Sequence, residues 1–557
     1  MTDNSDTPIA IATDTSSPTL HFAVDELTDS VSRNVSVHDT GDVSINEMDL
    51  IVETSSGLEK TDLGDSVQLP ADLDEEGFKI EHRQVNGASV TVVSAPAGVG
   101  AMYGALEVAE QVRMGVSITD IEETTSSPEV SFRAIKFNLP WSPYRGGDQT
   151  EVHYDTCRDL EFWEAFLDMM ARNRFNALTL WNLHPFAFMV RPENYPEACP
   201  FDDDELADWQ EFWKTLFQMA HDRGIKTYIL NWNIVVTPEF AEAYDVDERN
   251  DESEIIKTYT REAVTQVVNE YEGLDGMGVS LCDWMKGMTP REKEEWMLDT
   301  IVAGIEDADR SIEFLHRSVL TGSIEEMRRG IDETAEGDNV SDVLVPTKFN
   351  WSHGHSTPRL ELTHDYTSGK VDDRLWNPEP ENYSIAWMIR NEDFFVLRWG
   401  NPEFVREHLA QNHENKSYVD GYFVGSEAFI PAKDFSHETH RHQTWDYIFE
   451  KQWLLYKVWG RLLYDPETSD EVFEQAFDDR YEPAVEGNLL EAYRQASQVP
   501  EELASFHVGT WDYTLYSEGF LAPVEALGLD EVTSPFISIN EFIDHRTLDS
   551  RYISIKE

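Results

Sequence analysis

Cysteines, basic residues and long apolar runs are all scarce in this chain of 557 residues. Its three cysteines, Cys157, Cys199 and Cys282, lack metal-site spacing, so we expect neither a disulfide framework nor a zinc module. No stretch approaches ~18 uninterrupted apolar residues, which argues against a membrane-spanning helix. Residues 1–6 contain neither a basic region nor an apolar core, so no signal peptide is expected and we predict a cytoplasmic protein.

Positive charge is the most conspicuous deficit. The chain has 107 acidic and 43 basic residues, which gives a net charge of −64 spread along the whole length. The negative charges on such a surface repel one another, and dissolved salt weakens this repulsion by screening the charges. We therefore predict a halophilic protein that works in multimolar salt. Nucleic acids and anionic membranes are disfavoured as partners, whereas the 40% of hydrophobic residues suffices for a packed interior.

The order of apolar segments predicts three parts. Residues 1–125 are expected to form a small N-terminal α+β domain, with strands at 20–24 and 89–94, a helix at 101–112 and a linker at 124–128. Residues 126–435 alternate short apolar strands with amphipathic helices, such as those at 160–173 and 209–223. This alternation is typical of a (β/α)8 TIM barrel in the α/β class. The eight expected strands span residues 132–138, 177–182, 226–232, 276–283, 312–318, 343–350, 384–390 and 421–427.

Residues 436–557 are expected to form a C-terminal helical domain. Apolar and aromatic spacing predicts one long helix at 444–464 and two more at 469–481 and 483–498. We expect this domain to pack on the barrel and to offer a surface for a homodimer.

Tryptophan and amide side chains follow the first three barrel strands, where a TIM barrel builds its active site. Aromatic faces stack on pyranose rings, and Asn or His binds their hydroxyls, so these residues are typical of a sugar site. The alternative is that the tryptophans cap the barrel core. The residues concerned are Trp141, Trp181, Asn182, His184 and Trp232.

Carboxylates follow later strands, and hydrolysis of a glycosidic bond needs two of them on opposite sides of that bond. Asp283 follows the fourth strand, Asp365 the sixth and Glu427 the eighth, and His353 lies near Asp365 in sequence. An adjacent indole would raise the pKa of Asp283 by desolvation and suit it to act as an acid. The alternatives are a helix cap or a salt bridge to Lys286 for Asp283, and an ion pair at the barrel rim for Glu427.

Basic side chains also stand at strand ends, although the chain as a whole is acidic. Arg317, Lys348 and Arg390 follow the fifth, sixth and seventh strands and suggest a negatively charged ligand such as a uronate. Internal ion pairing is the alternative. The His353-x-His355 pair could indicate a metal, but such pairs in metal-dependent hydrolases usually lie on a first strand. We therefore expect no metal or other cofactor and place His355 among the substrate-binding residues.

Three segments resemble the alpha-glucuronidases of glycoside hydrolase family 67 and, more loosely, hexosaminidase-like enzymes with a similar N-terminal domain. They are GVGAMYGAL at residues 98–106, ELTHDYTSG at 361–369 and WLLYKVWGRLLYDP at 453–466. The resemblance implies that Asp365 falls on the general-base carboxylate of the family. The chain departs from the family at the acid, where Asp283 stands earlier than the expected Glu, and at His353, which stands near an expected Asp.

The resulting hypothesis is a glycoside hydrolase that acts on short, uronate-bearing oligosaccharides. The resemblance implies inversion, with Asp283 protonating the leaving oxygen and Asp365, helped by His353, activating water. One alternative is substrate-assisted cleavage of an N-acetylated sugar, which normally needs adjacent Asp and Glu residues after the fourth strand. Another is a carbohydrate-binding protein without catalysis, and a third is a metal-dependent hydrolase.

Overall fold

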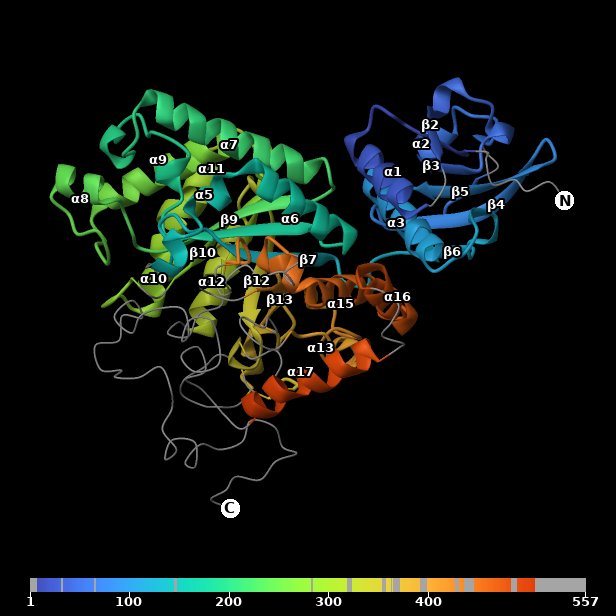
Figure 1. The fold of residues 1–557 in the computed structure, drawn as a ribbon. Coiled ribbons are helices and arrows are strands. Elements are labelled where there is room, and N and C mark those ends of the chain that lie inside the picture. Colours follow the sequence, from blue (N-terminus) through green and yellow to red (C-terminus); the bar gives the residue numbers. More distant parts are fainter. Residues whose placement is uncertain are drawn as a thin grey trace, which may run out of the picture.

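The computed structural model describes residues 8–31, 34–64, 67–144, 148–281, 284–317, 323–352, 357–361, 363, 371–390, 398–425, 430–434, 445–481 and 488–505. Figure 1 shows a sheet domain at the N-terminus, a barrel with surrounding helices, and a last group of helices of which the first members lie between the two. Within these residues, no helix is both long enough and apolar enough to cross a membrane.

The N-terminal domain is a six-stranded sheet with the order β2-β1-β3-β5-β4-β6. Strands β2, β1, β3 and β5 are parallel, and β4 runs antiparallel to both β5 and β6. Helices α1 (Pro18–Ser30) and α3 (Gly98–Arg113) cover one face, and short segments that include α2 (Ser55–Leu58) cover the other. The strands are β1 (Ile9–Thr13), β2 (Val35–Asp39), β3 (Leu50–Thr54), β4 (Phe78–Val85), β5 (Ala88–Ala95) and β6 (Thr124–Ser126).

Two expectations for this domain were wrong. Residues 20–24 form part of α1 and not a strand, because Pro18 occupies the first helical position and the Ser17 side chain accepts a hydrogen bond from Leu20 N. Thr124–Ser126, expected to be linker, pairs with β4 as an edge strand. The predicted strand at 89–94 and helix at 101–112 are confirmed as parts of β5 and α3.

The barrel is closed, as predicted, by eight parallel strands in the order β7-β8-β9-β10-β11-β12-β13-β14. The first three strands have the predicted bounds. The sixth ends before its predicted limit because residues 349–352 turn into a short 3-10 helix. The strands are β7 (Phe132–Asn138), β8 (Ala177–Asn182), β9 (Lys226–Trp232), β10 (Gly276–Ser280), β11 (Ile312–Arg317), β12 (Val340–Lys348), β13 (Ser384–Ile389) and β14 (Val419–Val424).

Amphipathic helices surround the barrel and bury their apolar faces against its outer surface. Helix α7 begins earlier than predicted, because Asp202 and Glu205 form a capping box in which each side chain accepts a hydrogen bond from the other residue's backbone N–H. The main helices are α6 (Leu160–Arg172), α7 (Asp203–His221), α8 (Pro238–Tyr244), α9 (Glu254–Glu270), α10 (Pro290–Met297), α12 (Ile324–Ala335) and α13 (Pro402–Asn412). Shorter helices are α4 (Asp148–Glu151), α5 (Tyr154–Arg158) and α11 (Ala303–Glu306).

The last helices bridge the barrel and the N-terminal domain, as Figure 1 shows. The long helix expected at 444–464 is instead two helices, α14 (Ile448–Lys451) and α15 (Trp453–Tyr464), because Gln452 leaves helical geometry between them. Helix α15 is buried on almost every side. Helix α16 (Asp470–Arg480) follows, close to the helix predicted at 469–481. Helix α17 (Leu489–Ser505) begins and ends later than the helix predicted at 483–498.

Candidate active site

The carboxyl ends of the barrel strands form the candidate site, and we call this end the mouth of the barrel. Alternate side chains of a strand point into a barrel, and residues in register on parallel neighbours share a face. Leu230 and Trp232 of β9 belong to the apolar cluster inside the barrel. Ser280 is in register with Trp232, and Arg317 is in register with Ser280. Trp232, Ser280 and Arg317 therefore point inward at the mouth.

Aromatic rings form one wall of the mouth. Trp181 and Trp232 are buried, with ring centroids 5.3 Å apart and a tilt of 56°. Tyr144 stacks on Trp232 at 5.0 Å, and Trp284 packs against Tyr144 at 5.6 Å. Because Tyr144 and Trp284 are only partly buried, they carry the aromatic surface that a sugar could reach. Neither residue was predicted to bind the sugar: Tyr144 was not singled out, and Trp284 was considered only as the indole next to Asp283 in the sequence.

Trp141 does not lie with Trp181 and Trp232. Its buried ring meets Trp209 at 4.9 Å and Trp213 at 6.2 Å, both on α7, so it sits in the layer between the barrel wall and its helices. This is the arrangement expected of a core residue.

Asn182 and His184 shape the loop that follows β8. The Asn182 side chain accepts a hydrogen bond from the backbone N–H of His184 at 2.7 Å and donates one to the Trp141 carbonyl. The His184 Nε2 atom lies 2.7 Å from the Tyr259 hydroxyl, and burial lowers the pKa of His184 to about 4. His184 is therefore neutral at pH 7, and both side chains hold the backbone near the mouth.

Three basic side chains gather at the ends of consecutive strands. Arg317 is 5% exposed, Lys348 5% and Arg390 2%. The Arg317 guanidinium donates to Ser280 Oγ at 3.0 Å and lies 5.9 Å from the centre of the Trp181 ring. Lys348 is in register with Met388, a member of the inner cluster, and Arg390 follows Met388 by two residues. Burying charge is costly, so three buried cations at the mouth mark a site built for polar or anionic contacts.

A fourth basic residue, Lys136, was missed because it lies within a predicted strand and not at its end. Ala134, two residues earlier on β7, belongs to the inner cluster, so Lys136 shares the inward face. Its ammonium donates to Asn138 Oδ1 at 2.8 Å and lies 4.6 Å from the Trp181 ring centre and 5.7 Å from that of Trp232. The period of two along β7 was the signal that could have found it.

Some buried donors beside the mouth have no hydrogen-bond partner within the described part of the chain. They are the indole Nε1 of Trp232 and the side-chain Nδ2 of Asn233. The Oδ1 atom of Asn233 is engaged, because it accepts a hydrogen bond from Asn231 Nδ2 at 3.1 Å. A buried donor without an acceptor costs free energy, which a bound acceptor would restore.

The expected catalytic residues Asp283, Asp365, Glu427 and His353 lie outside the described residues, as does His355. No group of three or more His, Cys, Asp or Glu side chains in the described part of the chain could hold a metal ion.

His316, next to Arg317, points out of the barrel. Its Nε2 atom lies 2.8 Å from Glu294 Oε2 on α10, and both side chains are buried. Burial alone would lower the pKa of His316, but the Glu294 carboxylate and neighbouring backbone groups outweigh burial and raise it. This ion pair fastens α10 to the outer face of β11.

Two of the three segments that carry the family resemblance lie on α3 and α15, which meet at the junction between the domains. Directly after the first segment, Glu107 and Glu110 continue α3, the helix that contains the Gly-x-x-Tyr-Gly residues. In the third, Arg461 of α15 lies 3.2 Å from Glu107 Oε2 and 3.0 Å from Glu110 Oε2. Arg174, beside β8, reaches Glu107 Oε2 at 2.8 Å. A Cβ atom on Gly460 would overlap the Asn173 carbonyl oxygen, so glycine lets α15 approach the barrel. These segments therefore hold the three parts of the chain together.

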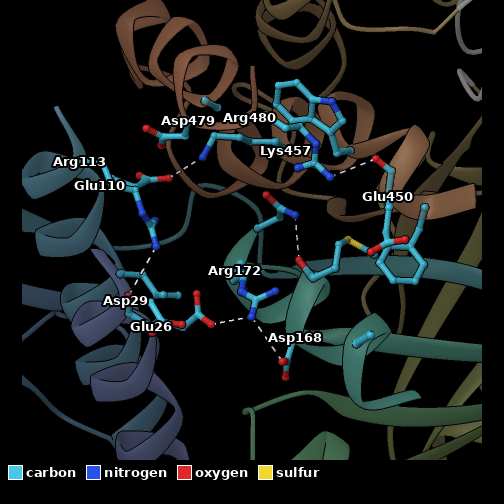
Figure 2. Close-up of a pocket in the computed structure, with 17 residues that line it drawn as sticks. Glu26, Asp29, Glu110, Arg113, Asp168, Arg172, Glu450, Lys457, Asp479 and Arg480 are labelled. Carbon is cyan, nitrogen blue, oxygen red and sulfur yellow. Dashed lines mark hydrogen bonds and ion pairs between the residues drawn. The ribbon is translucent and has the colours of Figure 1, made fainter. Parts of the chain in front are cut away.

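A pocket of about 640 Å³ opens at this junction (Figure 2). Its walls come from α1, α3 and α6 and from the helices α14–α16. Oppositely charged side chains pair across it: Arg172 lies 2.6 Å from Glu26, and Lys457 lies 2.8 Å from Glu110. None of the described candidate site residues lines this pocket, which lies beside the barrel and between the domains.

Comparison with known proteins assigns the N-terminal domain. Residues 1–108 match the family model described as glycosyl hydrolase family 67 N-terminus. This match confirms the resemblance inferred from the Gly-x-x-Tyr-Gly segment for that part of the chain. No curated protein matches the chain in sequence.

Solved structures of glycoside hydrolases share the fold. One, described as a GH138 enzyme targeting pectin rhamnogalacturonan II, has a TM-score of 0.71 and 20% identity, covering 91% of this chain and 72% of the other. The chitobiase of Flavobacterium johnsoniae has a TM-score of 0.50 and 10% identity, covering 90% of this chain and 71% of the other. The chain thus begins with a domain that matches the family 67 N-terminus, and its TIM barrel shares the fold of these solved glycoside hydrolases.

Proposed function

We propose that this protein is a glycosidase that cleaves the glycosidic bond of short, uronate-bearing oligosaccharides. The observation that carries the proposal is the set of buried cations at consecutive strand ends, Arg317, Lys348 and Arg390. In a chain of net charge −64, three basic side chains inside one barrel mouth favour a ligand with a carboxylate. Pectin is a uronate-bearing polysaccharide, so the likeness to an enzyme described as targeting pectin rhamnogalacturonan II supports the same substrate class.

The proposed chemistry is an inverting hydrolysis. Asp283 gives its proton to the oxygen of the leaving sugar as the bond to the anomeric carbon breaks. Asp365, assisted by His353, takes a proton from a water molecule whose oxygen bonds to that carbon from the opposite face. This assignment rests on the position of these residues in the sequence and on the family resemblance. Inversion requires room for the water between the two carboxyl groups, roughly 6.5–9.5 Å.

Substrate binding divides between the two sides of the mouth. The cationic residues would hold the carboxylate, and bidentate contact with a guanidinium would fix its plane. Tyr144 and Trp284 would stack on the apolar face of the ring, supported by Trp181 and Trp232. Bound this way, the sugar would lie beside the residues that follow β10 and β12.

The proposed setting is concentrated salt. A net charge of −64 repels itself at low ionic strength, where the Debye length is about 30 Å at 0.01 M, against about 3 Å at 1 M. The protein should therefore be most stable and most active in molar KCl. Thermal unfolding recorded between 0.1 and 3 M KCl should give a rising midpoint, and a flat or falling profile would contradict the proposed setting.

The test of the function is hydrolysis of uronate-decorated and N-acetylated oligosaccharides in molar KCl by the wild type and by Asp365→Asn. Asp342→Asn, at the opposite end of β12, is the matched control. We expect the wild type and the control to release a uronic acid of inverted configuration, read by proton NMR, and Asp365→Asn to lose about 1,000-fold or more in rate. Release of N-acetylated sugar alone, or full activity of Asp365→Asn, would refute the proposal.

A further inference from the structure

We propose that Arg249, which stacks on Trp284 at the rim of the barrel mouth, binds a carboxylate on the leaving-group side of the substrate. The rim would then select an oligosaccharide in which the sugar next to the cleaved uronate is itself a uronate. This inference rests on the proposed function and deepens it, because it extends the substrate class from one acidic sugar to two neighbouring ones.

The aromatic wall of the mouth ends at Arg249. Trp232 belongs to the cluster inside the barrel, Tyr144 stacks on it at 5.0 Å, and Trp284 packs against Tyr144 at 5.6 Å. The Arg249 guanidinium lies 5.2 Å from the centre of the Trp284 ring. Exposure increases along this row, from the buried Trp232 to the exposed Arg249. If the cations inside the mouth hold the terminal uronate, the next sugar of the substrate lies toward Arg249.

Backbone hydrogen bonds fix the two segments that carry Arg249 and Trp284. Arg249 forms an antiparallel bridge with Val235, which follows β9. The N–H group of Ile234 donates to the Trp284 carbonyl at 3.0 Å, and that of Asn250 donates to the Ile234 carbonyl at 3.3 Å. The loops after β9 and β10 are thus tied together beside the guanidinium and the indole. Both groups are positioned before a ligand arrives, which lowers the entropic cost of binding.

The Arg249 side chain makes neither an ion pair nor a hydrogen bond within the part of the chain that the structure describes. Carboxylates are nevertheless close in the sequence, because Asp247, Glu248 and Asp251 lie within two residues of it. The Asp251 carboxylate instead accepts hydrogen bonds from the backbone N–H groups of Asp247 and Ser253. A guanidinium that stacks on a ring by its face keeps the donors at its edge for a carboxylate.

A second exposed cation, Lys286, lies on the same rim two residues after Trp284. Its backbone N–H group donates to Asn250 Oδ1 at 3.3 Å, which places it next to the segment of Arg249. Lys286 also makes no ion pair with any residue that the structure describes. Two such cations raise the local positive potential and would draw an acidic sugar toward this side of the mouth.

The test compares two substrates that release the same uronic acid. In one the leaving sugar is a second uronate, and in the other it is the matching neutral hexose. For the wild type in molar KCl we expect kcat/KM to be about three- to fivefold higher on the acidic substrate, the upper range of an exposed charge contact. Arg249→Gln should remove this preference through a higher KM with little change in kcat, because a contact remote from the reacting atoms binds substrate and transition state equally. Arg249→Lys should recover part of it.

Arg480→Gln is the matched control for a structural role. Arg480 is also exposed and lies 5.0 Å from the centre of a tryptophan ring, that of Trp453, but it stands at the junction between the domains. Its replacement should leave the ratio of the two kcat/KM values unchanged. Thermal unfolding in molar KCl identifies any variant that fails to fold. Equal losses on both substrates for Arg249→Gln, or a preference that persists in this variant, would overturn the inference.

Direct binding separates this inference from the proposed function. The probes are two thio-linked disaccharides, which resist hydrolysis: one contains two uronates, and the other contains a uronate and a neutral hexose. Calorimetric titration should give the wild type a lower Kd for the first, and Arg249→Gln should abolish the difference. If that pattern appears without turnover of any substrate, the rim subsite stands and the glycosidase proposal fails. If the wild type releases uronic acid equally well from both substrates and binds both disaccharides equally, the rim subsite is wrong although the proposed function holds.

Discussion

Replacing Arg461 with Met should destabilise the protein by about 3 kcal/mol, because it leaves the buried Glu110 carboxylate and the partly buried Glu107 carboxylate with one cation fewer. The Arg461 side chain is 2% exposed and lies 3.2 Å from Glu107 and 3.0 Å from Glu110. Methionine keeps much of the apolar volume, so the loss is mainly electrostatic. Breaking a buried pair costs about 3–5 kcal/mol, and Arg174, 2.8 Å from Glu107, keeps the value near the lower end.

The assay is urea unfolding in molar KCl, followed by tryptophan fluorescence. Arg406→Met is the control, because Arg406 makes a comparable 2.9 Å contact with Asp470 but its side chain is 32% exposed. Exposed pairs are worth about 0–1 kcal/mol, and salt screens them further. If the Arg461 variant loses no more stability than the Arg406 variant, the view of this cluster as the joint between the domains is wrong.

The loss of stability at acidic pH gives a second measure of the ion pairs between Arg461 and the carboxylates of Glu107 and Glu110. Burial raises the pKa values of Glu107 and Glu110, but Arg461 and the other nearby cations outweigh burial and lower both. Lowered carboxyl pKa values stabilise the fold above the unfolded value of about 4.5, and that stability is lost as the pH falls through the folded values. Without Arg461 the stabilisation is smaller, so the Met variant should unfold at a higher pH than the wild type.

Two further predictions concern packing and pH. Gly460→Ala should lower stability by about 1–3 kcal/mol although alanine favours helices, because the added Cβ atom would overlap the Asn173 carbonyl and push α15 away; a gain in the midpoint of urea unfolding would contradict this. The raised pKa of His316 adds stability that is complete below about pH 6.5 and is lost as the pH rises through the folded value. The Tm of the wild type should therefore fall more steeply above pH 6.5 than that of His316→Gln, and parallel Tm profiles would refute the role of the Glu294 pair.

The barrel was predictable because its strands are buried on both faces and appear as short, nearly continuous apolar runs. Three strands, beginning at Phe132, Ala177 and Lys226, have the predicted bounds. The same rule failed at residues 20–24, because a short apolar run fits a strand and a buried helix equally well. There the deciding signal was Ser17 followed by Pro18, a helix start that lies outside the apolar run itself.

The sequence near the strand ends predicted only part of the site, because side chains alternate between the inside and the outside of the barrel only within a strand. Trp181 and Trp232 lie within strands, where the period of two orients them inward. Trp141 follows β7 after Leu139 and Pro140, so alternation no longer applies, and its ring lies outside the barrel wall. Lys136 shows the opposite case: it obeys the alternation, yet it escaped notice because it precedes the strand end by two residues.

The distribution of buried cations links the acidic composition to the proposed function. The chain has 43 basic and 107 acidic residues, and buried basic side chains occur both at the domain joint and inside the barrel. At the domain joint, each guanidinium has an acidic partner: Arg174 lies 2.8 Å from Glu107, and Arg461 contacts the same carboxylate. Inside the barrel, the contacts of Lys136 and Arg317 include an amide, a hydroxyl and the faces of indole rings. Several basic side chains gathered at one end of the barrel attract an incoming anion, so the barrel mouth is where we expect a substrate carboxylate to bind.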